Sequence, residues 1–97
     1  DWEQFHNLRT LSTSIALEAA ELMEHTQWTN DADLPAIAAE RREAIAEEIA
    51  DIAILLTYLA HDLRVDLQTA VRQKLVKNAA KYPVEKARGV ATKYDRL

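Results

Sequence analysis

Two acidic pairs are the residues of this chain whose types and spacing best suit chemistry. Glu18 pairs with Glu21 and Glu48 pairs with Asp51, the members of each pair standing three positions apart. Residues three apart on a helix are neighbours on one face. Since both pairs lie in segments that are otherwise apolar, we expect two helices, each aiming two carboxylates in nearly one direction.

Glu18 stands where an apolar residue is expected. A buried stripe on a helix has apolar residues at alternating spacings of three and four. Such a stripe passes through Leu8, Leu11, Ile15, Glu18 and Leu22. A carboxylate in such a stripe is costly to bury unless a positive group meets it. No Lys or Arg lies three or four residues from any of the four acidic side chains. They therefore form an oxygen-rich site suited to a hard cation, Mg²⁺ with Mn²⁺ as a substitute.

The alternative for a single pair at this spacing is a solvated acidic face, or pairing with bases elsewhere in the fold. Two such pairs, each embedded in an apolar stripe, favour the metal site. The run of Glu40, Glu43 and Glu47 has no such setting and is interpreted as a solvated face.

The distribution of charge narrows the class of ligand. The 97-residue chain has a net charge of −4, but residues 1–66 carry 14 acidic and 4 basic side chains, whereas residues 67–97 carry 2 and 8. An acidic protein is a poor candidate for binding polymeric nucleic acid. An acidic segment that binds a metal ion, followed by a cationic segment, suits a small anion that is bound together with a metal cation. This combination points to a phosphate ester.

Composition also bounds the fold and the compartment. One glycine, two prolines and no cysteine predict an all-α chain without disulfides or thiolate metal sites. We find no signal-peptide pattern and no apolar run near the ~20 residues of a membrane span, so we expect a cytoplasmic protein with no membrane partner. A domain of this size buries about two-thirds of its unfolded surface, which favours an oligomer that shares its core.

Three main helices are expected to position the acidic pairs within one domain, residues 1–97. The first begins between Asn7 and Thr10 and ends near His25. The polar segment 26–35, which ends in a proline, has the composition of a loop.

The second helix begins within residues 36–41 and runs to Arg64. Its almost wholly apolar stretch, residues 52–60, predicts the central and most buried helix of the fold. Its apolar stripe consists of Ile45, Ile49, Ile52, Leu56, Leu59 and Leu63. The third helix is capped by Asp66 and stopped by Pro83.

The third helix carries a basic and polar face. Lys74, Asn78 and Lys81 stand four and three positions apart and share one side, with Tyr82 beside them. Lysines hold phosphates as point charges, and asparagine and tyrosine hydrogen-bond sugar or phosphate oxygens. The simplest alternative is a solvated basic face, whereas a neighbouring acidic metal site favours phosphate binding.

Three segments resemble the MazG-like, all-α nucleotide pyrophosphohydrolases, and above all their dCTP pyrophosphatase branch: EAAELMEHTQW, EEIADI and KLVKNAAKYP. The family's E-x-x-E and E-x-x-D metal pattern falls on Glu18, Glu21, Glu48 and Asp51. Its K-x-x-x-N-x-x-K-Y pattern falls on Lys74, Asn78, Lys81 and Tyr82. The likeness spans nearly the whole chain. That branch has a further helix before the DWEQF segment, at which this sequence begins.

The resemblance implies Mg²⁺-dependent hydrolysis of a nucleoside triphosphate between its α and β phosphates, with dCTP or a related deoxynucleotide favoured, as nucleotide-pool cleansing. Glu48 and Glu21 are the candidate catalytic residues, although the sequence does not decide which carboxylate acts as the base. The metal would polarise the phosphate, and the basic face would offset charge on the leaving pyrophosphate. The resemblance also implies a homotetramer made of two dimers, which completes the helical bundle.

The base of the nucleotide is expected to lie against aromatic side chains. Trp2, His6 and Trp28 match positions that the dCTP branch keeps near its ligand. For the two tryptophans the alternative is packing of a chain end and a helix end onto the core. Tyr58, in the apolar part of the second helix, is predicted to be a core residue.

Two rival functions stay open. One is a MazG-like hydrolase with a broader or different base preference. The other is a non-catalytic helical oligomer that binds Mg²⁺-nucleotide, or merely assembles, with its carboxylates idle.

Overall fold

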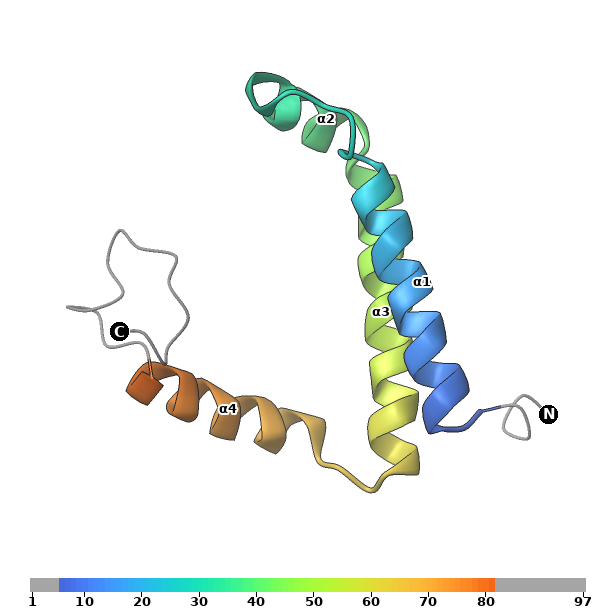
Figure 1. Ribbon diagram of the computed structural model, residues 1–97, viewed down its shortest axis with the longest axis vertical. Coiled ribbons are helices and arrows are strands. Elements are labelled where there is room, and N and C mark those ends of the chain that lie inside the picture. The colour runs from blue at the N-terminus through green and yellow to red at the C-terminus, as the bar shows by residue number, and fades with distance from the viewer. Residues whose placement is uncertain (1–5, 82–97) are drawn as a thin grey trace. The chain divides into compact units, whose positions relative to one another are not determined.

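The computed structural model describes residues 6–81, and every regular element in that range is helical (Figure 1). The elements are α1 (Leu8–Glu24), a short 3-10 turn η2 (Asp31–Asp33), α2 (Leu34–Glu40), α3 (Arg42–Asp62) and α4 (Leu67–Lys81). The predicted all-α fold class is thereby confirmed. The chain divides into two compact units, residues 1–64 and 65–97, and each is described by itself.

Helix α1 begins where a capping box predicts it. The Asn7 side chain accepts a hydrogen bond from the backbone N–H of Thr10 at 2.9 Å, and the Thr10 hydroxyl accepts one from the backbone N–H of Asn7 at 3.0 Å. This reciprocal pair satisfies amide donors that a helix start leaves without an intrahelical partner. The helix then runs through Glu24, with His25 as its C-cap, which agrees with the expected bounds.

Helices α1 and α3 lie side by side and run antiparallel (Figure 1). Leu11 of α1 is the fully buried side chain of the described residues, at 1% exposure. The half-buried residues along α1 continue at helical spacing through Ile15, Glu18 and Leu22. Those of α3 include Ile45, Glu48, Ile52, Leu55 and Leu59. Each helix therefore carries one glutamate in the apolar seam through which it contacts the other.

The predicted apolar stripe of α3 has one half-buried edge and one exposed edge. This differs from the expectation that the helix is central and the most buried. Ile45, Ile52 and Leu59 are half-buried, whereas Ile49 and Leu63 are 56% and 51% exposed. No residue of α3 is fully buried. The physical reason is that α1 covers one edge only, because a single helix neighbour buries a narrow strip of an apolar surface.

The predicted second helix is interrupted at Arg41, whose φ of −103° and ψ of 19° separate α2 from α3. Its N-terminal part also begins earlier than expected, because Pro35 lies in the first turn of α2 instead of closing the loop. Proline is tolerated there, since the first-turn amide has no intrahelical acceptor. Helix α2 contacts η2 and α3.

The end of the first unit and the start of the second follow from backbone conformation. Arg64, just after α3, has a φ of 54°, a left-handed value that stops the helix. In the second unit, the Asp66 carboxylate accepts a hydrogen bond from the backbone N–H of Thr69 at 3.0 Å, which confirms Asp66 as the N-cap of α4. The expected stop at Pro83 lies outside the described residues.

None of the helices between residues 6 and 81 combines the length and the apolar character needed to cross a bilayer.

Replacing Leu11 by alanine is expected to lower the free energy of unfolding by about 2–5 kcal/mol, because it opens a cavity where the α1–α3 seam is most closely packed. Denaturant unfolding at a fixed protein concentration measures the change. Ser12→Ala on the exposed side of α1 is the matched control and should stay within about 0.5 kcal/mol of the parent. A Leu11→Ala protein as stable as this control would contradict the assignment of the core.

Candidate functional site

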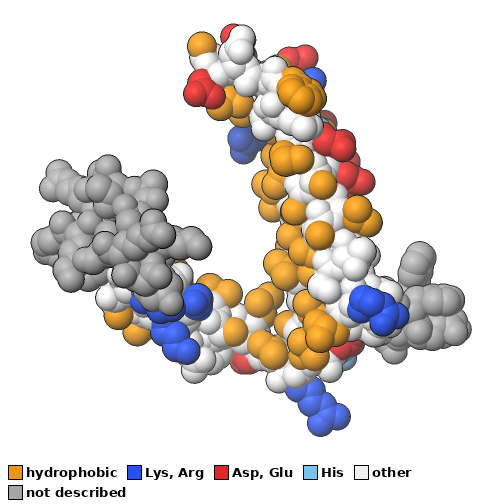
Figure 2. Space-filling view, in the orientation of Figure 1, with side chains coloured by type: hydrophobic (Ala, Val, Ile, Leu, Met, Phe, Trp, Pro, Cys, Tyr) orange, Lys and Arg blue, Asp and Glu red, His pale blue; other side chains and the backbone are white. Residues whose placement is uncertain are grey.

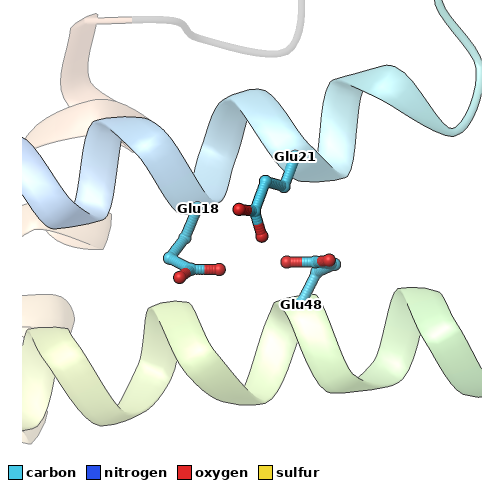
Figure 3. A group of neighbouring side chains, drawn as sticks. All are labelled: Glu18, Glu21 and Glu48. Atoms are coloured by element: carbon cyan, nitrogen blue, oxygen red, sulfur yellow. The ribbon is translucent and has the colours of Figure 1, made fainter.

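Three carboxylates converge between α1 and α3. Glu18 and Glu21 project from α1 and Glu48 from α3, and their side chains point toward one another across the space between the helices (Figure 3). One oxygen of each lies within 4.8 Å of the others. Glu18 and Glu48 are half-buried, and Glu21 is exposed.

The helix pair itself brings these side chains together. Glu18 of α1 and Glu48 of α3 occupy positions in the apolar contact surface where an apolar residue is expected, and they lie opposite each other. Glu21 stands three positions after Glu18 on the same face of α1. The apolar neighbours Ile15 and Ile52 are half-buried beside them. Since both helices are anchored by these contacts, the carboxylates are presented on rigid elements.

Partial burial makes the negative charge of this cluster unfavourable. The pKa of Glu18 is raised from 4.5 to about 7. The largest cause is desolvation, followed by the hydrogen bond to Glu48 and the negative charges of Glu21 and Asp51. Desolvation and the charges of Glu21 and Asp51 also raise the pKa of Glu48, although its hydrogen bond to Glu18 acts in the opposite direction. No cation among the described residues offsets this repulsion at Glu18.

Two buried oxygens in the cluster fit a metal ion. Oε2 of Glu18 and Oε2 of Glu48 are both buried and have no hydrogen-bond partner. Buried polar atoms are normally paired, and carboxylate oxygens are the ligands that hard divalent cations prefer. The residues present therefore suit a cation such as Mg²⁺, which would meet both orphaned oxygens and relieve the repulsion among the carboxylates.

Asp51, the fourth predicted ligand, stands outside the three-carboxylate group. It is exposed on α3, three positions after Glu48, and its charge still contributes to the raised pKa of Glu18 and of Glu48. The structure thus brings together three of the four predicted ligands and keeps the fourth within electrostatic reach.

The predicted phosphate-binding residues lie on the second unit. Lys74 and Asn78 are exposed on α4, and Lys81, at its C-terminal end, is half-buried. Tyr82 lies outside the described residues, as does Trp2 of the predicted base-binding set.

The two described base-binding candidates lie at opposite ends of α1. His6 precedes the helix, and Trp28, which is 90% exposed, follows it. A 17-residue helix is about 25 Å long at ~1.5 Å per residue. This length exceeds the span of a nucleobase, so His6 and Trp28 of one chain do not hold the same base.

Tyr58 is not the core residue that the sequence predicts. It is 48% exposed, and its ring lies 5.3 Å from that of His6, centroid to centroid, at 43°. The interpretation failed because α1 leaves that side of α3 uncovered. The aromatic pair forms a partly open surface at the start of α1, which no local spacing in the sequence indicates.

Arg41 is a second residue that sequence reasoning missed. Together with Glu21, Glu24, His25 and Glu48 it lines a pocket of about 400 Å³ beside the carboxylates. Its Nη1 donates a hydrogen bond to the backbone carbonyl of His25 at 3.1 Å. The two residues are 16 positions apart, so only the turn between α1 and α2 brings them together.

Comparison with known proteins shows the family of this chain. The family model described as MazG-like matches residues 13–97, a range that includes all three converging carboxylates. The chain belongs to the MazG-like family. The sequence-based identification of the family is thereby confirmed.

Curated relatives of this MazG-like chain carry the name dCTP pyrophosphatase 1. The protein of Rattus norvegicus is 42% identical and that of Homo sapiens 39% identical, over 100% of this chain and 58% of each relative. This chain thus spans about three-fifths of the length of the curated relatives it matches. A solved structure of a pyrophosphatase from Archaeoglobus fulgidus is 37% identical, with a TM-score of 0.80 over 84% of this chain and 77% of that one.

The raised pKa of Glu18 predicts that the metal-free protein loses stability as pH rises from about 4.5 to about 7. In that window the folded state binds more protons than the unfolded state, so the free energy of unfolding falls with pH. Glu18→Gln removes this group, and its melting temperature in chelator should exceed that of the parent at about pH 8, with a smaller difference at about pH 5.

Glu24→Gln, on the exposed part of the same helix, is the control and should follow the parent. Mg²⁺ added at about pH 8 should raise the melting temperature of the parent and not that of Glu18→Gln. Parallel pH profiles of the parent and Glu18→Gln in chelator would contradict this account of the cluster.

Proposed function

We propose that this chain is a Mg²⁺-dependent nucleoside triphosphate pyrophosphohydrolase that converts a (d)NTP to the (d)NMP and pyrophosphate. The observation that carries the proposal is the convergence of Glu18, Glu21 and Glu48, with two buried oxygens that lack partners. The relatives named dCTP pyrophosphatase 1 support dCTP or a related deoxynucleotide as the preferred substrate.

Each carboxylate has a role in the proposed reaction. Glu18, Glu21, Glu48 and Asp51 would hold Mg²⁺, which supplies positive charge to the phosphates and acidifies bound water. Glu48 or Glu21 would accept the proton of the water that attacks the α-phosphate. A base with a pKa near the working pH is the most effective, and the raised pKa of Glu48 is a shift in that direction.

The predicted phosphate-binding and base-binding residues would hold the substrate's other groups. Lys74 and Lys81 would offset phosphate charge, and Asn78 and Tyr82 would hydrogen-bond sugar or phosphate oxygens. The base would stack on aromatic side chains from the set Trp2, His6 and Trp28, with Tyr58 supporting His6.

Assembly would join aromatic surfaces that one chain keeps apart. Since His6 and Trp28 stand at opposite ends of α1, both can face one base only if they come from different copies. Hydrophobic side chains are exposed along the α1–α3 pair (Figure 2), and such surfaces mark interaction sites when they are contiguous. Together with the family resemblance, these exposed side chains support a homotetramer made of two dimers, with the uncovered edge of α3 in an interface.

We further propose that residues 1–97 form a single MazG-like catalytic domain. Its cellular role would be cleansing of the nucleotide pool in the cytoplasm, where free nucleotides are its substrates. Neither polymeric nucleic acid nor membrane is a partner in this proposal.

Incubation with each dNTP, with and without Mg²⁺, tests the activity. Monophosphate and pyrophosphate should form only with the metal, and dCTP should be consumed fastest. Glu48→Gln should lower turnover by about 100-fold or more, because it removes a charged ligand and a candidate base. Glu47→Gln, one residue earlier and exposed on α3, is the matched control and should keep the parent rate.

Other products would decide between the rival functions. Diphosphate and orthophosphate would contradict α–β cleavage. Binding of Mg²⁺-nucleotide without any product would favour the non-catalytic helical oligomer, and similar rates for all bases would favour a MazG-like hydrolase of broad preference.

Light scattering coupled to size exclusion tests the assembly. The chain should elute at four times its 11.0 kDa mass, and Ile49→Glu should shift it to smaller species by placing a charge on the uncovered edge of α3. Glu43→Lys changes charge at an exposed polar position of the same helix and should leave the mass unchanged. A parent protein at the mass of one chain would refute the assembly.

A further inference from the structure

The pocket beside the carboxylates contains one permanently charged cation. Its lining residues are Glu21, Glu24, His25, Arg41 and Glu48. Two of these, Glu21 and Glu48, belong to the three-carboxylate group. Arg41 comes from the break between α2 and α3. The pocket is therefore the space directly next to the candidate metal site, on the side toward the C-terminal end of α1.

The guanidinium of Arg41 is held by a hydrogen bond to a backbone carbonyl and keeps its positive charge without an ion pair to a carboxylate of the described residues. Nη1 donates to the backbone carbonyl of His25 at 3.1 Å, in the region where a helix leaves carbonyls without intrahelical partners. Among the described residues, no carboxylate forms an ion pair with Arg41, although three glutamates line the same pocket. Since a guanidinium has five N–H donors, several remain for a ligand.

The lining favours a phosphate over the other parts of a nucleotide. Every lining residue is ionisable, and the imidazole of His25 is the one aromatic ring among them. Arginine matches the geometry of phosphate oxygens through two parallel hydrogen bonds. An anion entering a pocket lined by three glutamates needs a positive partner in addition to the metal ion, because like charges repel strongly in a partly desolvated site.

We propose that Arg41 is a phosphate-binding residue that holds the terminal pyrophosphate portion of the metal-bound nucleoside triphosphate. This inference rests on the proposed pyrophosphohydrolase function and adds a contact from the first unit of the chain. The carbonyl of His25 holds the side chain in place before the ligand arrives, so little rotamer entropy is lost on binding. As negative charge develops on the leaving pyrophosphate, the same guanidinium stabilises it.

Calorimetric titration with inorganic pyrophosphate in excess Mg²⁺ tests the contact without requiring turnover. Arg41→Ala should weaken pyrophosphate binding about tenfold or more, as expected for loss of hydrogen bonds to a charged group. Binding of dCMP under the same conditions should stay within about twofold of the parent, because the monophosphate lacks the terminal phosphates. The KM for dCTP should rise with the pyrophosphate dissociation constant.

Arg42→Ala is the matched control, because it removes the same charge one residue later at an exposed position that does not line this pocket. It should bind pyrophosphate as the parent does. Arg41→Lys, which keeps the charge but not the fork of donors, should recover part of the lost affinity. A purely structural Arg41 would instead lower the melting temperature in Arg41→Ala and weaken pyrophosphate and dCMP alike.

The outcomes separate this inference from the function on which it rests. A parent that hydrolyses dCTP, together with an Arg41→Ala protein that binds pyrophosphate like Arg42→Ala, overturns the role of Arg41 alone. Equal weakening of pyrophosphate and dCMP, or a parent that hydrolyses dCTP but does not bind pyrophosphate, also overturns it. A parent that forms no monophosphate from any dNTP overturns the proposed function.

Discussion

The candidate site depends on the close approach of two carboxylates, Glu18 and Glu48, which face each other between the apolar surfaces of α1 and α3. Desolvation and neighbouring negative charge raise the pKa of both, and one oxygen of each is buried without a partner. Apolar residues at these two positions would continue the stripes of α1 and α3 and would favour folding. A cation that joined the two glutamates would relieve this repulsion.

The packing of α1 against α3 keeps Glu18 and Glu48 close together. Leu11, Ile15 and Leu22 on α1 meet an apolar edge of α3, so burial on both sides of the glutamates offsets their desolvation. Helices also fix the direction of their side chains closely. The carboxylates are therefore held in fixed directions. A ligand that bound them would restore the stability that their desolvation costs.

The first unit leaves an apolar edge and two aromatic surfaces exposed, and the proposed assembly would bury them. The edge of α3 that carries Ile49 and Leu63 is exposed, and the aromatic surfaces at His6 and Trp28 are separated by the length of α1. Both features have the same origin, because two long antiparallel helices bury only the strip between them.

The sequence by itself determined where α1 and α4 begin and which acidic side chains make up the candidate site. Capping residues such as Asn7 and Asp66 and the interrupted apolar stripe at Glu18 are local signals, and local spacing is enough to interpret them. Only the tertiary structure decided which edge of α3 meets α1, that Asp51 stands outside the converging carboxylates, and that Arg41 reaches the carbonyl of His25. These features depend on how one helix is rotated about its axis relative to its neighbour, and on the path of the turn between helices. The periodicity of residues along a single helix does not specify either of these.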